Sequence, residues 1–177
     1  MIFNEKCIVF DTETTGLDPK CDEILQLSII DGNGKILFDE LLKPTQKTEW
    51  AEAEKIHHIS PEMVVNCQNF DYYKKQIQEI FDNAKTILAY NISFDWQFLE
   101  SCGIFFPKNA KYKDIMIDFA EIYGEERYDY YGNLSYKWQK LITAADYYGY
   151  QFNAHNSLED CKATLHVAKK IYDIFAK

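Results

Sequence analysis

The first forty residues alternate short apolar runs with turn-forming residues. The runs are rich in β-branched side chains, which favour strands, and glycine, proline and aspartate bound them. The segment Asp31-Gly32-Asn33-Gly34 is typical of a hairpin turn, so we expect the first three strands to be antiparallel. The predicted strands are Cys7 to Asp11, Ile24 to Asp31 and Lys35 to Leu42.

Beyond this region, apolar residues mostly recur every three or four positions, as in helices with one buried face. Ser60-Pro61-Glu62 is typical of a helix start, with Ser60 as the N-cap. One more strand is predicted at Thr86 to Tyr90, and Ile115 to Tyr123 has a mixed pattern. The predicted helices are Glu49 to His57, Asp71 to Asn83, Ser93 to Ser101, Tyr136 to Tyr148 and Ser157 to Phe175.

The last predicted helix is the longest and has a continuous apolar stripe. Strands first, then helices interleaved with another strand, predict an α/β fold with a mixed sheet. A chain of 177 residues fits one domain with a sizeable core, so we expect a single domain over residues 1–177. The stripe consists of Leu158, Cys161, Leu165, Ala168, Ile171, Ile174 and Phe175.

Composition narrows the class of protein. No apolar run approaches the roughly eighteen residues of a membrane span, and the N-terminus lacks the features of a signal peptide. We therefore expect a cytoplasmic protein without a membrane partner. The five cysteines are dispersed and form no CxxC pair, which predicts reduced thiols and no zinc site.

The formal net charge is −9, which argues against a protein that binds nucleic acid by broad charge attraction. A nuclease is still compatible with this charge. Carboxylates that hold divalent cations lose their local negative charge and present a positive face to phosphate.

Three acidic segments are the candidates for chemistry. Asp11 and Glu13 lie two apart on a predicted strand and so share one face, where a divalent cation would neutralise them. Asp95 lies in the first turn of the helix after the Thr86 to Tyr90 strand. Asp160 follows His155, whose imidazole suits a general base.

Each segment also has a plainer interpretation. The Asp11 and Glu13 pair could be structural or lie on the surface. Asp95 could be only a favourable first-turn residue. Ser157 could be an N-cap that forms a capping-box pattern with Asp160.

Together, the three segments resemble the DEDD exonuclease superfamily, in its DEDDh branch. Phe10-Asp11-Thr12-Glu13-Thr14-Thr15-Gly16 resembles the first family motif, and Tyr90-Asn91-x-x-Phe94-Asp95 resembles the second. His155, five residues before Asp160, resembles the third motif and marks the histidine branch. The resemblance extends from Phe10 to about Ala168. It departs from the family pattern at Ser157, where alanine is usual.

The resemblance implies a ribonuclease H-like fold, a mixed five-stranded sheet flanked by helices. It also implies a two-metal phosphodiesterase in which Asp11, Glu13, Asp95 and Asp160 hold two divalent ions, Mg²⁺ or Mn²⁺. His155 would take a proton from the attacking water. Ions roughly 4 Å apart would stabilise the attacking and leaving oxygens, and the product would be a nucleoside 5′-monophosphate.

The same resemblance implies a substrate-binding turn after the first strand. Thr12, Thr14, Gly16 and Leu17 would contact the 3′ end, although Leu17 could instead be a core or loop-packing residue. Gly16 permits a tight turn there.

Two further positions resemble family residues near the site. Ile56-His57-His58-Ile59 resembles a family segment in which His57 takes the histidine position and His58 replaces the usual glycine. Two adjacent histidines could also be surface residues. Asn91 could contact the substrate or only cap a helix.

Eight of the thirteen tyrosines lie between Tyr123 and Tyr150. With Arg127 and Lys137 they could stack single-stranded bases. Four acidic residues among them oppose phosphate, so packing or loop cover is the favoured interpretation. The acidic residues are Glu121, Glu125, Glu126 and Asp129.

The sequence thus predicts a metal-dependent 3′→5′ exonuclease on single-stranded or frayed 3′ ends, with DNA favoured over RNA. The resemblance includes the proofreading subunits of bacterial polymerases. Because the last predicted helix ends within two residues of the C-terminus, we expect a free-standing enzyme or one loosely recruited to a DNA polymerase. The alternatives are an RNA-trimming exoribonuclease, an inactive binding module and an interaction domain with accidental motifs.

Overall fold

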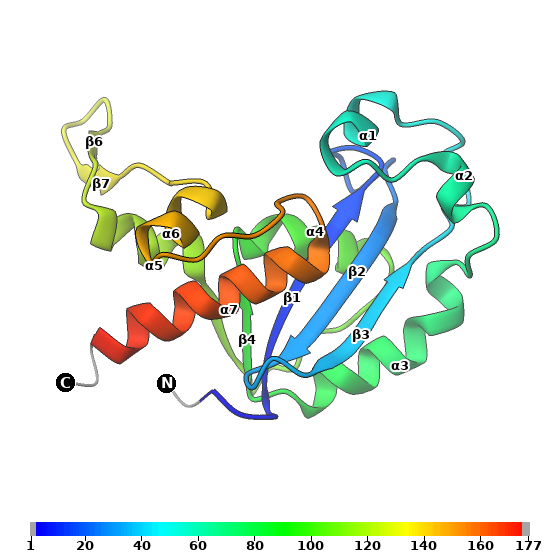
Figure 1. Cartoon of the computed structure of the whole chain (residues 1–177), viewed down its shortest axis with the longest axis horizontal. Coiled ribbons are helices and arrows are strands. Elements are labelled where there is room, and N and C mark those ends of the chain that lie inside the picture. The colour runs from blue at the N-terminus through cyan, green and yellow to red at the C-terminus, as the bar shows by residue number, and fades with distance from the viewer. Residues whose placement is uncertain (1–2, 175–177) are drawn as a thin grey trace.

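The computed structural model describes residues 3–174. A twisted five-stranded sheet, in the order β3-β2-β1-β4-β5, forms its centre (Figure 1). The pairs β1–β2 and β2–β3 are antiparallel, whereas β1–β4 and β4–β5 are parallel. The predicted mixed five-stranded sheet is therefore confirmed. The strands are β1 (Cys7–Thr14), β2 (Ile24–Asp31), β3 (Ile36–Leu41), β4 (Thr86–Ala89) and β5 (Lys111–Asp114).

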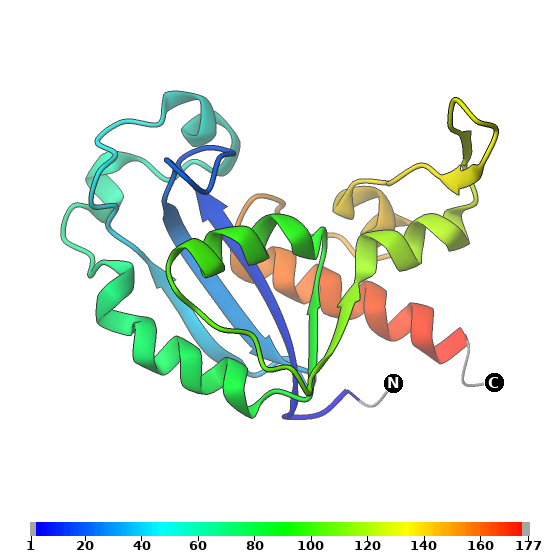
Figure 2. The same cartoon turned by 180° about the vertical axis from the view of Figure 1, so that it is seen from behind.

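Helices cover both faces of the sheet (Figures 1 and 2). On one face, α7 lies across β1 and β2, with α5 and α6 beside it. The other face is covered by α3 and α4. The helices are α1 (Ala51–His57), α2 (Pro61–Val64), α3 (Phe70–Asn83), α4 (Ile92–Ser101), α5 (Ile115–Tyr123), α6 (Leu141–Tyr147) and α7 (Ser157–Ile174).

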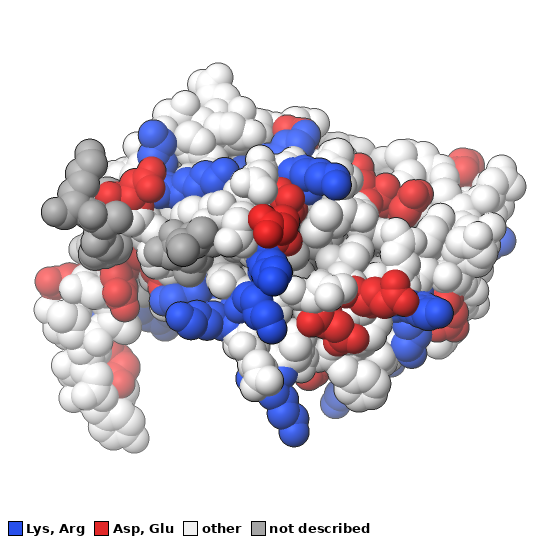
Figure 3. Space-filling model, turned by 90° about the horizontal axis from the view of Figure 1, so that it is seen from below, with Lys and Arg blue, Asp and Glu red and all other residues white. Residues whose placement is uncertain are grey.

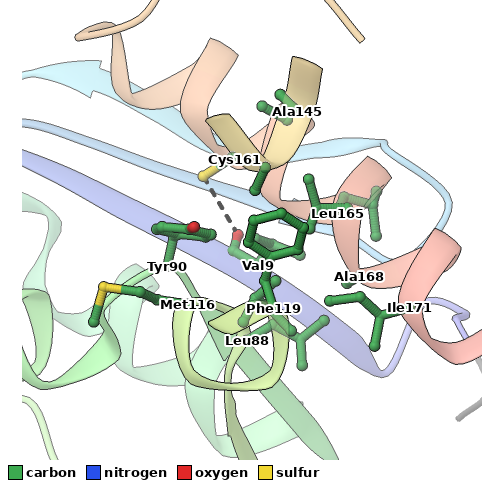
Figure 4. Close-up of a cluster of buried hydrophobic side chains, with 14 of the residues drawn as sticks. Val9, Leu88, Tyr90, Met116, Phe119, Ala145, Cys161, Leu165, Ala168 and Ile171 are labelled. Carbon is green, nitrogen blue, oxygen red and sulfur yellow. Dashed lines mark hydrogen bonds between the residues drawn. The ribbon is translucent and has the colours of Figure 1, made fainter. Parts of the chain in front are cut away.

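Strand β1 is buried on both faces because its apolar residues contribute to two cores. Val9 packs with Leu88, Phe119 and Leu165 under α5 and α7 (Figure 4). The alternate positions, including Phe10, pack against α3 and α4. This arrangement fixes the strand in the middle of the domain and determines where its carboxyl end lies.

The predicted helix at Tyr136 to Tyr148 is wrong in its first half. Only Leu141–Tyr147 is helical, and Leu134–Tyr136 instead forms strand β7, which pairs with β6 (Glu126–Tyr128). The Tyr136 end of the predicted helix therefore belongs to a hairpin, whose turn contains Gly132 with φ +80°.

Two elements were not resolved by the sequence pattern. Strand β5 has the polar sequence Lys-Tyr-Lys-Asp, which has no strand-like apolar run because it is an edge strand. The mixed segment after it is helix α5. The Asp114 side chain caps this helix by accepting from the Met116 N–H, and Gly124 ends it with φ +74°.

The last helix begins at Ser157 as predicted, but Ser157 does not cap it. Asn156 Oδ1 accepts from the Glu159 N–H instead. The stripe residues Cys161, Leu165, Ala168 and Ile171 are buried, and Leu158 is half-buried. Phe175 lies outside the described residues, and the side chain of Ile174 is not described.

The described helices include none that is long and apolar enough to cross a membrane. Viewed from below, where β1 begins, basic and acidic side chains are interspersed over the surface (Figure 3). This face therefore offers no continuous basic surface for phosphates.

Candidate active site

Three carboxylates from two elements meet at the carboxyl end of β1. Asp11 and Glu13 project on the same side of the strand, and Asp160 lies in the first turns of α7, which crosses β1. Each residue offers an oxygen within 4.8 Å of the others. The structure therefore brings together side chains that are nearly 150 positions apart in the sequence.

Asp95 lies beside this cluster, at the start of α4, and is 2% exposed. Its Oδ1 accepts two hydrogen bonds from Thr12, one from the backbone N–H at 2.9 Å and one from the hydroxyl at 2.6 Å. The carboxylate also raises the pKa of Asp11 by charge repulsion. Asp95 is thus held at the site by the residue between Asp11 and Glu13.

Burial and charge repulsion from neighbouring carboxylates favour protonation of these carboxyls. Burial is the largest cause in each case. It raises the pKa of Glu13 to about 8, with a further increase from Asp160 and Asp95. It raises the pKa of Asp95 and of Asp160 to about 7, and the pKa of Asp11 well above its usual value. Four acidic groups are therefore held where their charged forms are unfavourable without a cation.

The donor set fits a divalent cation. Asp160 Oδ1 is buried and has no hydrogen-bond partner. Within residues 3–174, no lysine or arginine forms an ion pair with any of the four carboxylates. Hard divalent cations prefer carboxylate oxygens, so Asp11, Glu13, Asp95 and Asp160 are the residues that could hold them.

His155 lies at the rim of the cluster. It is exposed, has a left-handed backbone with φ 67°, and donates its N–H to Asp160 Oδ2 at 3.2 Å. Together with Asp160 it lines a cavity of about 460 Å³. Other residues that line this cavity are Tyr90, Asn91, Met116, Trp138, Gln139, Lys140, Leu141, Ile142, Phe152 and Ala154.

A second cavity, of about 440 Å³, lies along the turn after β1 and is lined by Glu13 of the cluster. Leu17 lines it and is 83% exposed, so the interpretation of Leu17 as a core residue is wrong. The remaining lining residues are Thr12, Thr14, Thr15, Gly16, Trp50, Ala51, Glu52, Ala53, Ile56, His57 and Phe94.

Close packing against Asp22 explains why glycine occupies position 16 in this turn. A Cβ there would lie 2.4 Å from Asp22 Oδ2. Asp22 cannot move freely, because its carboxylate accepts from the Thr15 hydroxyl and the Asp18 N–H and pairs with Lys47. Glycine therefore allows the turn to approach the Asp22 carboxylate.

His57 is buried, so the surface interpretation is wrong for this histidine. Its Nδ1 accepts from the Ile59 N–H, which leaves Nε2 as the donor to the Thr14 carbonyl at 3.2 Å. Burial lowers its pKa and favours this neutral form. The ring therefore supports the turn at Thr14. The adjacent His58 takes the left-handed conformation, with φ 61°.

Sequence reasoning did not identify Asp114 as a contributor to the site. Its carboxylate accepts from the N–H groups of Asn91, Ile92 and Met116. These bonds hold the left-handed Asn91, φ 66°, at the edge of the His155 cavity. The available signal was the position of Asp114 before a helix, where aspartate is a good N-cap.

Residues 8–168 match the model of the RNase T family, described as exonuclease. The chain is 33% identical over 170 residues to the uncharacterized exonuclease CP81 of Escherichia phage 186, covering 89% of this chain and 84% of the phage protein. It is 25% identical over 176 residues to RNA exonuclease 4 of Saccharomyces cerevisiae, covering 97% of this chain and 56% of the yeast protein. A stretch of 95 residues is 33% identical to the PolC-type DNA polymerase III of Thermotoga maritima, but spans only 7% of that polymerase.

Among solved structures, E. coli exonuclease I in complex with a dT13 oligonucleotide superposes with a TM-score of 0.74 at 20% identity. The alignment covers 96% of this chain and 42% of exonuclease I. Exonuclease X in complex with 5′ overhanging duplex DNA gives a TM-score of 0.65 at 19% identity, covering 97% of this chain and 93% of that one. These structures share the fold, and the family match covers most of the sequence. The chain is therefore a nuclease that belongs to the RNase T, or DnaQ-like, exonuclease family.

Proposed function

We propose that this enzyme removes nucleoside 5′-monophosphates one at a time from the 3′ end of single-stranded or frayed DNA. The observation that carries the proposal is the meeting of Asp11, Glu13 and Asp160, together with the buried Asp160 Oδ1, which has no hydrogen-bond partner in the protein. Asp95, fixed by Thr12, completes the set. Such a set needs cations, and cations placed there can bind phosphate.

Asp11, Glu13, Asp95 and Asp160 would hold two divalent ions, Mg²⁺ or Mn²⁺. When bound, the ions supply charge stabilisation to the attacking and leaving oxygens of phosphodiester hydrolysis. The chain contributes a rigid arrangement of oxygens, because Asp95 is anchored to β1 and Asp160 to the start of α7.

His155 would be the general base. Its backbone N–H is bonded to Asp160, which holds the residue at the rim of the carboxylate cluster, and the residue is exposed to solvent. From this position it can accept a proton from a water molecule at the cluster.

The cavity beside the β1 turn would bind the terminal nucleoside. Leu17, Ile56 and Phe94 give it apolar walls suited to a base, and Thr14 and Gly16 border it. Thr12 and His57 would position other residues of the site, because their side chains bond to Asp95 and to the Thr14 carbonyl, respectively. Asn91 lies at the His155 cavity and would contact the strand beyond the cleaved bond.

Two relatives support different nucleic acid substrates. DNA polymerase III favours DNA and a loose association with a polymerase, whereas RNA exonuclease 4 matches nearly the whole chain and favours RNA. The primary proposal is DNA, and RNA trimming is the second candidate. All five cysteines are free thiols, which supports action in a reducing compartment such as the cytoplasm.

The deciding experiment uses 5′-labelled single-stranded DNA, RNA and duplexes incubated with Mg²⁺, Mn²⁺ or EDTA. We expect a ladder that shortens from the 3′ end, with DNA degraded faster than RNA and no reaction in EDTA. The Asp160→Asn variant is the matched control and should be inactive. Full activity in EDTA, or no shortening of any strand by the wild type, would contradict the proposal.

A further inference from the structure

A hairpin arm, residues 125–140, projects from the body between α5 and α6 (Figures 1 and 2). Its tip carries Tyr130 and Tyr131, which are 96% and 85% exposed. The expectation that tyrosines of this region pack holds for Tyr148 and Tyr150, whose rings contact Phe119 and His166. It is wrong for the tip, where two aromatic rings face solvent.

The arm presents these rings on a defined turn. Asp129 accepts from the N–H groups of Tyr131 and Asn133 and from the Asn133 side chain. Gly132 supplies the positive φ that the turn requires. Two tyrosines held on an ordered turn lose little conformational freedom when they bind something.

The acidic residues of the arm are balanced by basic residues of the same arm. Glu125 pairs with Lys137 at 2.7 Å, and Glu126 accepts from the Tyr128 hydroxyl. The Asp129 carboxylate accepts hydrogen bonds within the turn. Over residues 125–140 acidic and basic residues are equal in number, although the whole chain has a net charge of −9.

Two cations of the arm are available to phosphates. Neither Arg127 nor Lys140 forms an ion pair with any residue of the described part of the chain. The arm therefore combines exposed aromatic rings with unpaired positive charge, the combination that binds single-stranded nucleic acid.

The base of the arm is part of the catalytic surface. Trp138, 64% exposed, and Lys140 line the same cavity as His155 and Asp160. The Tyr90 hydroxyl, at the end of β4, donates to the Gln139 carbonyl at 2.8 Å and ties the base to the sheet. A strand that leaves the carboxylate cluster through this cavity meets the arm next.

We propose that the arm is a stacking platform for single-stranded nucleic acid and binds bases several nucleotides upstream of the 3′ end. This inference rests on the proposed function. Nine residues from Lys137 to Asp129 span up to roughly 25–30 Å at about 3.3 Å per residue. A strand that keeps duplex-like stacking, at about 3.4 Å per nucleotide, would cover the length of the arm in roughly eight nucleotides. A trinucleotide held at the carboxylates does not reach the tip.

The test compares the wild type with Tyr130→Ala/Tyr131→Ala on DNA and RNA 20-mers and trinucleotides. Stacking accounts for roughly five- to hundred-fold in affinity per base, so we expect KM for the preferred 20-mer to rise about tenfold. The kcat and the KM for the trinucleotide should not change. Tyr130→Trp/Tyr131→Trp should restore the low KM. Tyr72→Ala, which removes a tyrosine that is 67% exposed from α3, should behave as wild type.

Several outcomes would overturn the platform. One is an unchanged KM for the 20-mer, and another is an equal rise in KM for the 20-mer and the trinucleotide. The third is a wild-type dimer, seen by sedimentation, that the double variant abolishes. The last outcome would assign the tyrosines to a second copy of the chain. If the wild type shortens no strand at all, the proposed activity fails separately. Fluorescence anisotropy with a labelled 20-mer in EDTA then still measures whether the tip tyrosines contribute to binding.

Discussion

Thr12 donates both its backbone N–H and its hydroxyl to a single oxygen of Asp95, at 2.9 and 2.6 Å. Asp11 and Glu13 flank Thr12 on β1 and face the cation site, so Thr12 itself points to the other side of the strand. One strand therefore supplies two carboxylates and positions a third, which comes from α4. The Thr12 to Asp95 bonds make the geometry of the site depend on a residue that is itself 5% exposed.

Thr12→Val keeps the shape of the side chain but removes the hydroxyl donor. Asp95, which is fully enclosed, then loses one of its two bonds from Thr12. We expect a loss of stability of about 1–3 kcal/mol and a fall in nuclease activity of at least about tenfold. Thermal unfolding and the rate of nucleotide release measure the two effects. Thr12→Ser is the matched control and should retain both properties, and equal behaviour of Val and Ser would exclude the positioning role.

His155→Ala should lower kcat by about 10²–10⁴-fold, the usual contribution of a general base, with little change in KM. Because His155 has φ 67°, a region that histidine and asparagine occupy more readily than alanine, alanine also adds to the backbone strain. His155→Asn separates the two effects, since asparagine tolerates this conformation but cannot act as the base. Recovery of activity in the asparagine variant would show that the backbone, not the imidazole, matters.

Glu13→Gln should raise the thermal stability of the metal-free protein, increasingly as pH rises. Burial, with Asp160 and Asp95, raises the pKa of Glu13 from 4.5 to about 8. A raised folded-state pKa means that the folded protein holds the proton more tightly than the unfolded chain. This stabilisation is complete below about pH 4.5 and is lost as pH rises through about 8.

The measurement is the Tm of wild type and variant in EDTA between pH 5 and 8.5, with roughly 2–4 °C expected for each kcal/mol. Addition of Mn²⁺ at pH 8 should make the Tm of the wild type higher than that of the variant, because the cation stabilises the wild type more. Glu100→Gln, on the exposed side of α4, is the control and should follow the wild type. A Tm difference between wild type and Glu13→Gln that is independent of pH would contradict the electrostatic account of the site.

His58→Gly should stabilise the protein. His58 ends α1 in the left-handed conformation, and its N–H bonds to the Glu54 carbonyl. A non-glycine residue loses about 1 kcal/mol there relative to glycine, partly offset by the greater freedom of glycine in the unfolded chain. We expect a gain of about 0.5–1 kcal/mol by chemical denaturation, with activity unchanged. His58→Ala, which keeps the strain, should show no gain.

Much of the fold followed from local patterns. Strands β1 and β2 were predictable because they contain short apolar runs that are buried on both faces, and helices α3, α4 and α7 because each buries an apolar stripe. Strand β5 was not, since its polar residues resemble those of a loop and only its pairing with β4 makes it a strand. The hairpin of the arm was missed for a related reason, because its tyrosines form no periodic buried face.

The sequence by itself determined which residues are available for chemistry and on which elements they lie, because motifs and periodicity are local properties of the chain. The tertiary structure decided which of them meet. Packing of α7 across β1 brings Asp160 to Asp11, and the burial of His57 beside the turn after β1 directs its Nε2 to the Thr14 carbonyl. Contacts between distant segments depend on how whole elements pack, and no local pattern encodes that packing.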